Sequence, residues 1–210
     1  MERLQIKNDI EGMQEALIEA KKAFSIGEIP IGAIICDDKG NIIARGHNLR
    51  EKTFDATAHA EIVAIRKACT KLQNWRLSDL TLYVTIEPCP MCAGAIFSSR
   101  LKRLVYGATD WRAGGCESVF NIVNNHWLNH QAQIRAGVLE DECSLLVKNS
   151  FKLDVKIRIE VSLANKILFL EKFYKIKGIF TFFWRNKIYI QIVQELGGNI
   201  CQIYNKLSFL

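Results

Sequence analysis

Residues 57–61 read Thr-Ala-His-Ala-Glu, and residues 88–92 read Pro-Cys-Pro-Met-Cys. His59 offers a ring nitrogen, and Cys89 and Cys92 offer two thiolates, which together supply three of the four ligands that tetrahedral zinc takes. Three protein ligands leave the fourth position to water, as in catalytic zinc sites. Glu61 stands two residues after the histidine, where its carboxylate can carry that water's protons. The two stretches therefore predict a zinc-dependent hydrolytic enzyme.

Hydrophobic periodicity around these stretches predicts an α/β domain. Helices are expected over residues 8–26, 59–70, 90–99 and 141–152. Strands are expected over residues 31–36, 42–47, 80–86 and 103–107, with a fifth candidate at 131–136. The expected fold is a three-layer α/β/α arrangement with a mixed five-stranded sheet.

The two metal-binding stretches are expected to open helices 59–70 and 90–99, with Pro88 at the start of the second. The interval between them holds one helix and one strand, a crossover length that favours parallel pairing of neighbouring strands. Such pairing would bring the two helix N-termini together at the ends of the strands, where α/β folds place ligands. The positive ends of both helices would favour thiolates there.

Other chemistries compete for the same residues. A structural zinc site would need a fourth ligand, but Cys69 and Cys116 lack a partner at metal spacing. A redox Cys-x-x-Cys pair would not need His-Ala-Glu upstream. Glu61 by itself could be a surface glutamate that stabilises the start of a helix. The combination of all four residues favours the catalytic metal site.

Composition sets further bounds on the 210 residues. The N-terminus has no pattern of a secretory signal, and no window has the 18 apolar residues of a membrane span. The seven cysteines are odd in number and scattered, which favours reduced thiols in a cytoplasm. Residues 1–154 hold 19 basic and 19 acidic side chains, whereas residues 155–210 hold 9 and 3. The positive charge of the chain is therefore weak evidence for nucleic-acid binding by its first part.

His-Ala-Glu with Pro-Cys-x-x-Cys is the signature of the zinc nucleobase deaminases. Residues 27–143 resemble the bacterial tRNA-specific adenosine deaminases in particular. The resemblance rests on residues 27–33 (Gly-Glu-Ile-Pro-Ile-Gly-Ala), 55–62, 82–96, 105–108 (Val-Tyr-Gly-Ala), 128–130 (Leu-Asn-His) and 137–143. It implies conversion of adenosine 34 of a tRNA anticodon to inosine, with Zn²⁺ activating a water that attacks C6 and Glu61 as proton shuttle. It also implies a cytoplasmic homodimer acting on arginine tRNA.

The same resemblance implies further site residues. Asn48 matches the position that hydrogen-bonds the flipped base, and Ile29 and Pro30 match positions that line its pocket. Backbone N–H groups near Ala60 and Cys89 are expected to face the base or the attacking oxygen. Positions near the RNA are matched by Asp110, Asn129 and Phe151. Ser150 departs from the family, which has an aromatic residue there.

Two rival functions and the C-terminal segment stay open at this point. A free guanine or nucleoside deaminase would share the metal signature, and a non-catalytic zinc-stabilised RNA-binding module would share the ligands. The resemblance ends before residue 155, which predicts a deaminase domain over 1–154 and an extension over 155–210. That extension could add RNA affinity through its charge, lie on a membrane surface, or have no selected function.

Overall fold

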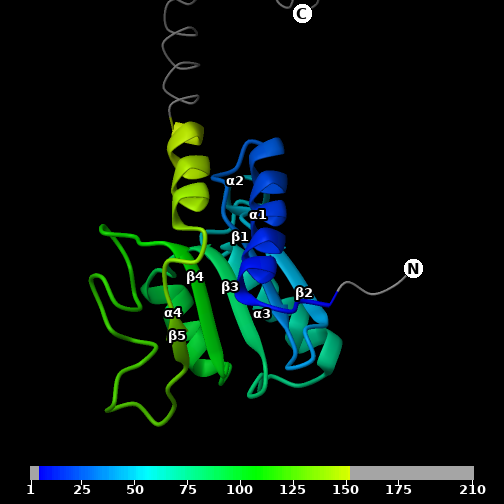
Figure 1. Cartoon of the computed structure of the whole chain (residues 1–210), viewed down its shortest axis with the longest axis vertical. Helices are drawn as coiled ribbons and strands as arrows, with labels where there is room; N and C mark the ends of the chain where they lie inside the picture. Colours follow the sequence, from blue (N-terminus) through cyan, green and yellow to red (C-terminus); the bar gives the residue numbers. More distant parts are fainter. Residues whose placement is uncertain (1–4, 152–210) are drawn as a thin grey trace, which may run out of the picture. The chain divides into compact units, whose positions relative to one another are not determined.

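The computed structural model describes residues 5–151, and the expected extension over residues 155–210 lies outside them. Figure 1 shows one sheet flanked by helices. The elements, in chain order, are α1 (Asp9–Ser25), β1 (Gly32–Cys36), β2 (Ile42–His47), α2 (Arg50–Thr53), α3 (Ala60–Leu72), β3 (Thr81–Ile86), α4 (Pro90–Ser98), β4 (Arg103–Ala108) and β5 (Gln133–Arg135). Residues 140–151 are also helical, so the expected last helix is confirmed as far as it is described.

The sheet is mixed and has five strands in the order β2-β1-β3-β4-β5. Strand β1 is antiparallel to both β2 and β3, whereas β3, β4 and β5 run parallel to one another. The mixed five-stranded sheet is confirmed. The expected fifth strand is confirmed too, but it is shorter than predicted, and its half-exposed residues explain its mixed hydrophobic pattern.

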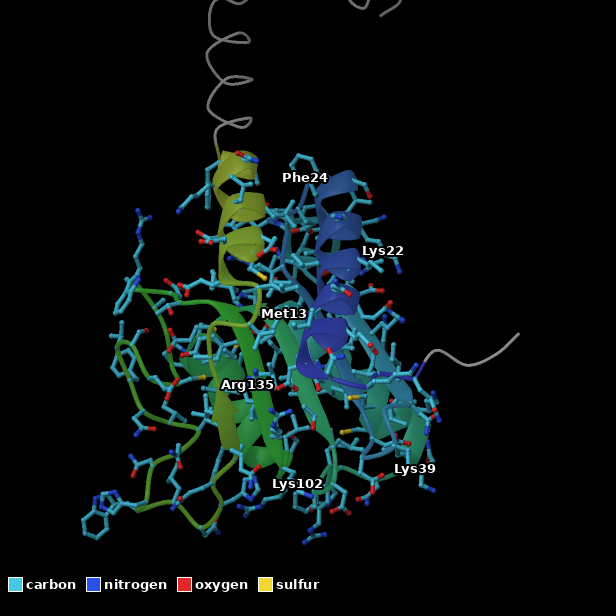
Figure 2. All side chains as sticks on the ribbon, in the orientation of Figure 1. Met13, Lys22, Phe24, Lys39, Lys102 and Arg135 are labelled. Carbon is cyan, nitrogen blue, oxygen red and sulfur yellow. The ribbon has the colours of Figure 1, made fainter. Side chains whose placement is uncertain are left out.

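Helices cover both faces of the sheet, which gives the expected three layers. One core packs α1 against the sheet and includes Met13, Ile34 and Val105. The other core lies on the opposite face, where residues of α3 and α4 pack on strand positions such as Ile35 and Leu104. Met13, labelled on α1 in Figure 2, is fully buried in this core. Because neighbouring strand residues enter opposite cores, the central strands are continuously apolar.

One topological prediction is wrong. Strands β2 and β3 were expected to pair as neighbours, but β1 lies between them. Strands β2 and β3 still run in the same direction, since both are antiparallel to β1. All five residues of β1 are buried, whereas β2 is only partly buried. The more apolar strand of the hairpin therefore takes the inner position and the other takes the edge.

Helix α4 begins at residue 90 as predicted, but a different proline opens it. Pro90, not Pro88, takes the first helical position, and Cys89 is the N-cap. A proline suits that position because its missing N–H has no partner within the helix in any case. Between residues 5 and 151, no helix is long and apolar enough to cross a membrane.

A buried carboxylate fastens the start of α1 to three strands. Asp9 is 8% exposed and accepts two hydrogen bonds from the Arg103 guanidinium, at 2.6 and 2.7 Å. Tyr83 donates its hydroxyl to the same carboxylate at 3.0 Å, and Arg135 also pairs with it. The hydrogen bonds from Arg103 lower the pKa of Asp9 from 3.8 to about 2, against the opposing effect of burial. The charged form of Asp9 therefore stabilises the fold.

Replacing Asp9 by asparagine is expected to lower the free energy of unfolding by about 2 kcal/mol at neutral pH. The pKa is lower in the folded than in the unfolded chain, so this stabilisation is complete above the unfolded value of 3.8 and is lost as the pH falls through about 2. Urea unfolding of the wild type and Asp9→Asn should thus show a difference that shrinks to roughly half by about pH 3. Asp38→Asn, at an exposed position, is the control. A difference that does not change with pH would contradict the role of the charge.

Candidate metal centre

The two predicted ligand stretches open helices, as expected. His59 is the residue before α3, and Cys89 is the residue before α4. Both have extended backbones, and their carbonyls accept the first helical hydrogen bonds from Val63 and Ala93, at 3.0 and 2.8 Å. The unsatisfied N–H groups of both first turns therefore give the site a partial positive charge that favours anionic ligands.

The three side chains meet in one group. His59 Nδ1 lies 3.7 Å from Cys89 Sγ and 3.6 Å from Cys92 Sγ, and all three candidate ligand atoms lie within 4.8 Å of one another. Zinc bonds of about 2.0–2.3 Å at tetrahedral angles would separate nitrogen from sulfur by about 3.6 Å. The observed spacing and the donor set of one imidazole and two thiols thus fit a zinc ion.

The group has three candidate ligands. Among residues 5–151 it contains no fourth histidine, cysteine, aspartate or glutamate. Cys116 is buried beside the ligand segment but outside the group, with its thiol 3.9 Å from the Pro88 carbonyl oxygen, and Cys69 lies near the Trp75 carbonyl. Neither completes the group, so the arrangement of the described residues favours a catalytic over a structural site.

Glu61 is buried, as its predicted role requires. It lies in the first turn of α3 and is 2% exposed, so it is not the surface glutamate of the alternative interpretation. Burial raises the pKa of its carboxyl, although the neighbouring His59 acts in the opposite direction. A carboxyl group with a raised pKa can take up a proton near neutral pH and release it again.

The two cysteines differ in acidity. The hydrogen bond from Cys92 lowers the pKa of Cys89 to about 4, and His59 adds to this effect. The pKa of Cys92 is raised, because its thiol is hydrogen-bonded to Cys89 and buried. The pKa of His59 is raised by its hydrogen bond with Cys89. The lowered pKa of Cys89 favours its thiolate form, and a bound metal cation would favour the thiolate of Cys92 as well.

Asn48 and the predicted pocket residues lie close to the ligand helices in the fold. The backbone N–H of Asn48 donates to the Ile31 carbonyl at 3.0 Å, and Leu49 donates to Ala58 at the same distance. These bonds join the Ile29–Pro30 turn to the segment that leads into His59. Ala60 is fully buried in the first turn of α3.

Sequence reasoning missed Glu28, which holds Asn48. The Glu28 carboxylate is buried and accepts a hydrogen bond from Asn48 Nδ2 at 3.1 Å and another from the Lys52 backbone N–H at 2.8 Å. This pairing directs the amide nitrogen of Asn48 toward Glu28. The partners are 20 and 24 residues apart in the sequence, so no local pattern indicated them.

The predicted RNA-proximal residues are spread over the surface. Asp110 lies in the loop after β4, where its Oδ1 accepts the backbone N–H groups of Arg112 and Ala113. Asn129 accepts a hydrogen bond from Arg100, just beyond the C-terminal end of α4, whereas Cys89 and Cys92 lie at its N-terminal end. Phe151 is half exposed in the helical segment 140–151. The roles of these three residues stay predictions.

Figure 2 helps to place the site relative to the sheet. Lys39 and Lys102, both labelled, lie at the end of the sheet where strands β2 and β4 begin. The ligand helices α3 and α4 begin after the last residues of β2 and β3, and therefore at the opposite ends of the strands. The site therefore lies beside the carboxyl ends of strands, as the sequence predicted.

Gly115 lets the loop after β4 approach the ligand segment. A Cβ atom at this position would lie 2.8 Å from the Pro90 nitrogen and 2.9 Å from the Cys89 carbonyl carbon. Backbone atoms cannot yield, so Gly115→Ala is expected to displace Cys89, weaken zinc binding about tenfold and destabilise the fold by about 1–3 kcal/mol. Competition with a chromogenic chelator measures the affinity. Gly94→Ala is the control, because α4 leaves open space around Gly94; equal affinities in the two variants would contradict the prediction.

Comparison with known proteins places this chain among deaminases. The family described as MafB19-like deaminase matches residues 7–142. A tRNA-specific adenosine deaminase of Haemophilus influenzae is 49% identical over 140 residues, which cover 67% of this chain and 81% of that protein. The tRNA-specific adenosine deaminase of Bacillus subtilis is also 49% identical over 140 residues, covering 67% of this chain and 86% of that protein.

Solved structures share the fold. One from a study of A-to-I editing by tRNA:A34 deaminases at the wobble position of transfer RNA has a TM-score of 0.62 and 42% identity, covering 64% of this chain and 97% of that chain. A guanine deaminase from Nitrosomonas europaea has a TM-score of 0.61 at 23% identity, covering 71% and 87%. The second likeness concerns the fold alone.

Proposed function

This chain belongs to the family of tRNA-specific adenosine deaminases, and from that premise we propose that it hydrolyses adenosine at the wobble position, 34, of a tRNA to inosine. The observation that carries this function is the group of three candidate ligands, His59, Cys89 and Cys92. The buried Glu61 lies two residues after His59, in the first turn of α3. Identity of 49% to adenosine deaminases favours this substrate over guanine.

We propose that His59, Cys89 and Cys92 hold one Zn²⁺ ion per chain. When bound, the ion would supply an activated water at neutral pH, whose oxygen becomes O6 of the inosine. Glu61 takes one proton from that water and delivers it to the ring nitrogen next to C6, and then carries the second proton of the same water to the departing amine. The reaction consumes one water and releases ammonia, so atoms and charges balance. The raised pKa of Glu61 suits both transfers, because the protonated form is accessible between them.

Recognition of the base requires that it leave the stack of the anticodon loop. Asn48 would hydrogen-bond the extruded base, and the pairing of its amide nitrogen with Glu28 fixes its orientation. Ile29 and Pro30 would line the pocket, and the backbone near Ala60 would contact the base or the incoming oxygen. Asp110, Asn129 and Phe151 are proposed to lie near the RNA backbone.

The setting of the reaction is part of the same proposal. The enzyme would act in the cytoplasm, as a homodimer, on an arginine tRNA. Large apolar side chains are exposed after β4 at Val119, Phe120 and Trp127, and exposed side chains of this kind are compatible with an interaction surface. Light scattering at micromolar concentration tests the dimer: a monomeric mass at every concentration would refute it.

Two substrates separate the proposed function from its rivals. The protein is incubated with an anticodon stem-loop that carries A at position 34 and, separately, with guanine. We expect inosine from the stem-loop and no xanthine from guanine. Turnover of guanine alone would refute the proposal, and binding of the stem-loop without turnover would indicate an RNA-binding module. A stem-loop with A at position 35 instead of 34 controls for wobble selectivity, and arginine and non-arginine stem-loops test the choice of tRNA.

A further inference from the structure

Glu87 is a buried carboxylate that neither the metal group nor the proposed proton transfers use. It follows β3, two residues before Cys89, and is 1% exposed. Its Oε1 accepts the backbone N–H groups of Cys116, Glu117 and Ser118, at 3.1, 2.9 and 3.0 Å. Its Oε2 accepts the backbone N–H of Asp110 at 3.1 Å. One side chain thus binds both ends of the loop formed by residues 110–118.

Four N–H donors make Glu87 a stable anion. Both oxygens of the buried carboxylate are satisfied by backbone N–H groups of the loop, three on Oε1 and one on Oε2. The side chain is therefore an anchor for the loop, and it is not among the three candidate metal ligands.

The 110–118 loop is fitted around this anchor and against the metal ligands. A Cβ atom at Gly114 would lie 2.0 Å from Ser118 Oγ and 2.4 Å from the Glu87 carboxylate, so glycine lets the loop pack closely on this anchor. Gly115 donates its N–H to the Pro88 carbonyl at 2.7 Å and packs on the Cys89–Pro90 peptide. The position of the loop is thereby tied to the start of α4, where two of the metal ligands lie.

The outer part of the same loop faces solvent with side chains suited to RNA. Trp111 is 78% exposed, and Arg112 is exposed beside it. An indole can stack on an unpaired base, and a guanidinium can bind phosphate or stack. Two backbone bonds to Asp110 Oδ1, from Arg112 and Ala113, fix the turn that presents them. The Asp110 N–H bond to Glu87 links that turn to the anchor.

We propose that Glu87 is a positioning residue for the RNA substrate: it holds the 110–118 loop so that Trp111 and Arg112 contact the anticodon loop beside the metal centre. The proposal rests on the proposed function and deepens it. Its specific content is that Glu87 acts on RNA binding through the loop and takes no part in the chemical step.

Glu87→Gln tests this with the least disturbance. The glutamine Oε1 can still accept the N–H groups of residues 116–118, but its amide nitrogen cannot accept the N–H of Asp110. We expect KM for the stem-loop to rise about tenfold, kcat to stay within about threefold, and zinc content to stay at one per chain. Hydrogen exchange of the Asp110 amide should accelerate by about tenfold or more. Glu142→Gln is the control, because it removes the same charge at an exposed position.

A double-mutant cycle with Arg112→Ala shows whether the effect passes through the loop. If it does, Glu87→Gln raises KM much less in the Arg112→Ala background than in the wild type. An unchanged KM, a lowered kcat or lost zinc in Glu87→Gln would overturn the proposal, and so would independent effects in the cycle. The wild-type assay distinguishes the proposed function from the role of Glu87. A wild type that is inactive toward the stem-loop would refute both. An active wild type with an unaffected Glu87→Gln variant would refute only the role of Glu87.

Discussion

Glu61→Gln is expected to lower kcat for the stem-loop by at least about 10³-fold while leaving one zinc per chain. Glutamine keeps the size and the hydrogen-bonding capacity of the side chain but cannot accept a proton from water or return one to the leaving amine. The carboxylate is buried and interacts with His59 and Cys92, so the substitution removes a proton carrier beside the metal group. Single-turnover assays under saturating enzyme, with inosine measured by mass spectrometry, give kcat without interference from product release.

The matched control is Glu15→Gln, which changes a carboxylate on α1, on the other face of the sheet. Binding of the stem-loop by Glu61→Gln should stay close to that of the wild type, because the substitution removes no predicted RNA contact. Activity of Glu61→Gln within tenfold of the wild type would show that the proton shuttle is another group, and loss of zinc would show that Glu61 supports the metal instead.

Cys92→Ala is expected to weaken zinc binding by about 10³-fold or more and to abolish deamination. Cys92 is fully buried in α4, so a new ligand cannot easily reach the site to replace it. Elemental analysis after dialysis should find one zinc per wild-type chain and almost none in the variant. A chelator should lower the Tm of the wild type, because it removes the zinc ion that stabilises the folded state. It should leave the Tm of the variant unchanged.

Cys69→Ala is the control for this prediction, since Cys69 is a free cysteine outside the metal group. It should bind zinc like the wild type. Readdition of zinc to the chelated wild type should restore activity, which would exclude irreversible unfolding as the cause of the loss. Full zinc content in Cys92→Ala would refute the ligand assignment.

The ligand set was predictable because its information is local. Cys89 and Cys92 are three residues apart at the start of one helix, and His59 and Glu61 share the start of another. Helix starts and strand periodicity depend on near neighbours, so the elements and the three layers followed from the sequence as well. The errors concern how elements pair: β1 entered between β2 and β3 because it is the most completely buried strand.

The supporting contacts could not be predicted, since they join residues far apart in the chain. Glu87 reaches Ser118 across 31 residues, and Asp9 reaches Arg103 across 94. In the sequence both acidic residues look like ordinary charges beside a helix or a strand. Their burial, and therefore their need for partners, becomes evident only when the sheet has brought its loops together.

By itself the sequence predicted the metal ligands and the proton carrier, and it determined the α/β class and the resemblance to a family, because each depends on residue types at short spacing. The tertiary structure decided that β1 lies between β2 and β3. It also showed how many described residues join the metal group and which buried carboxylates hold the segments around it. The physical reason is that local spacing selects helix starts and ligands, whereas burial and long-range hydrogen bonds depend on the packing of distant segments.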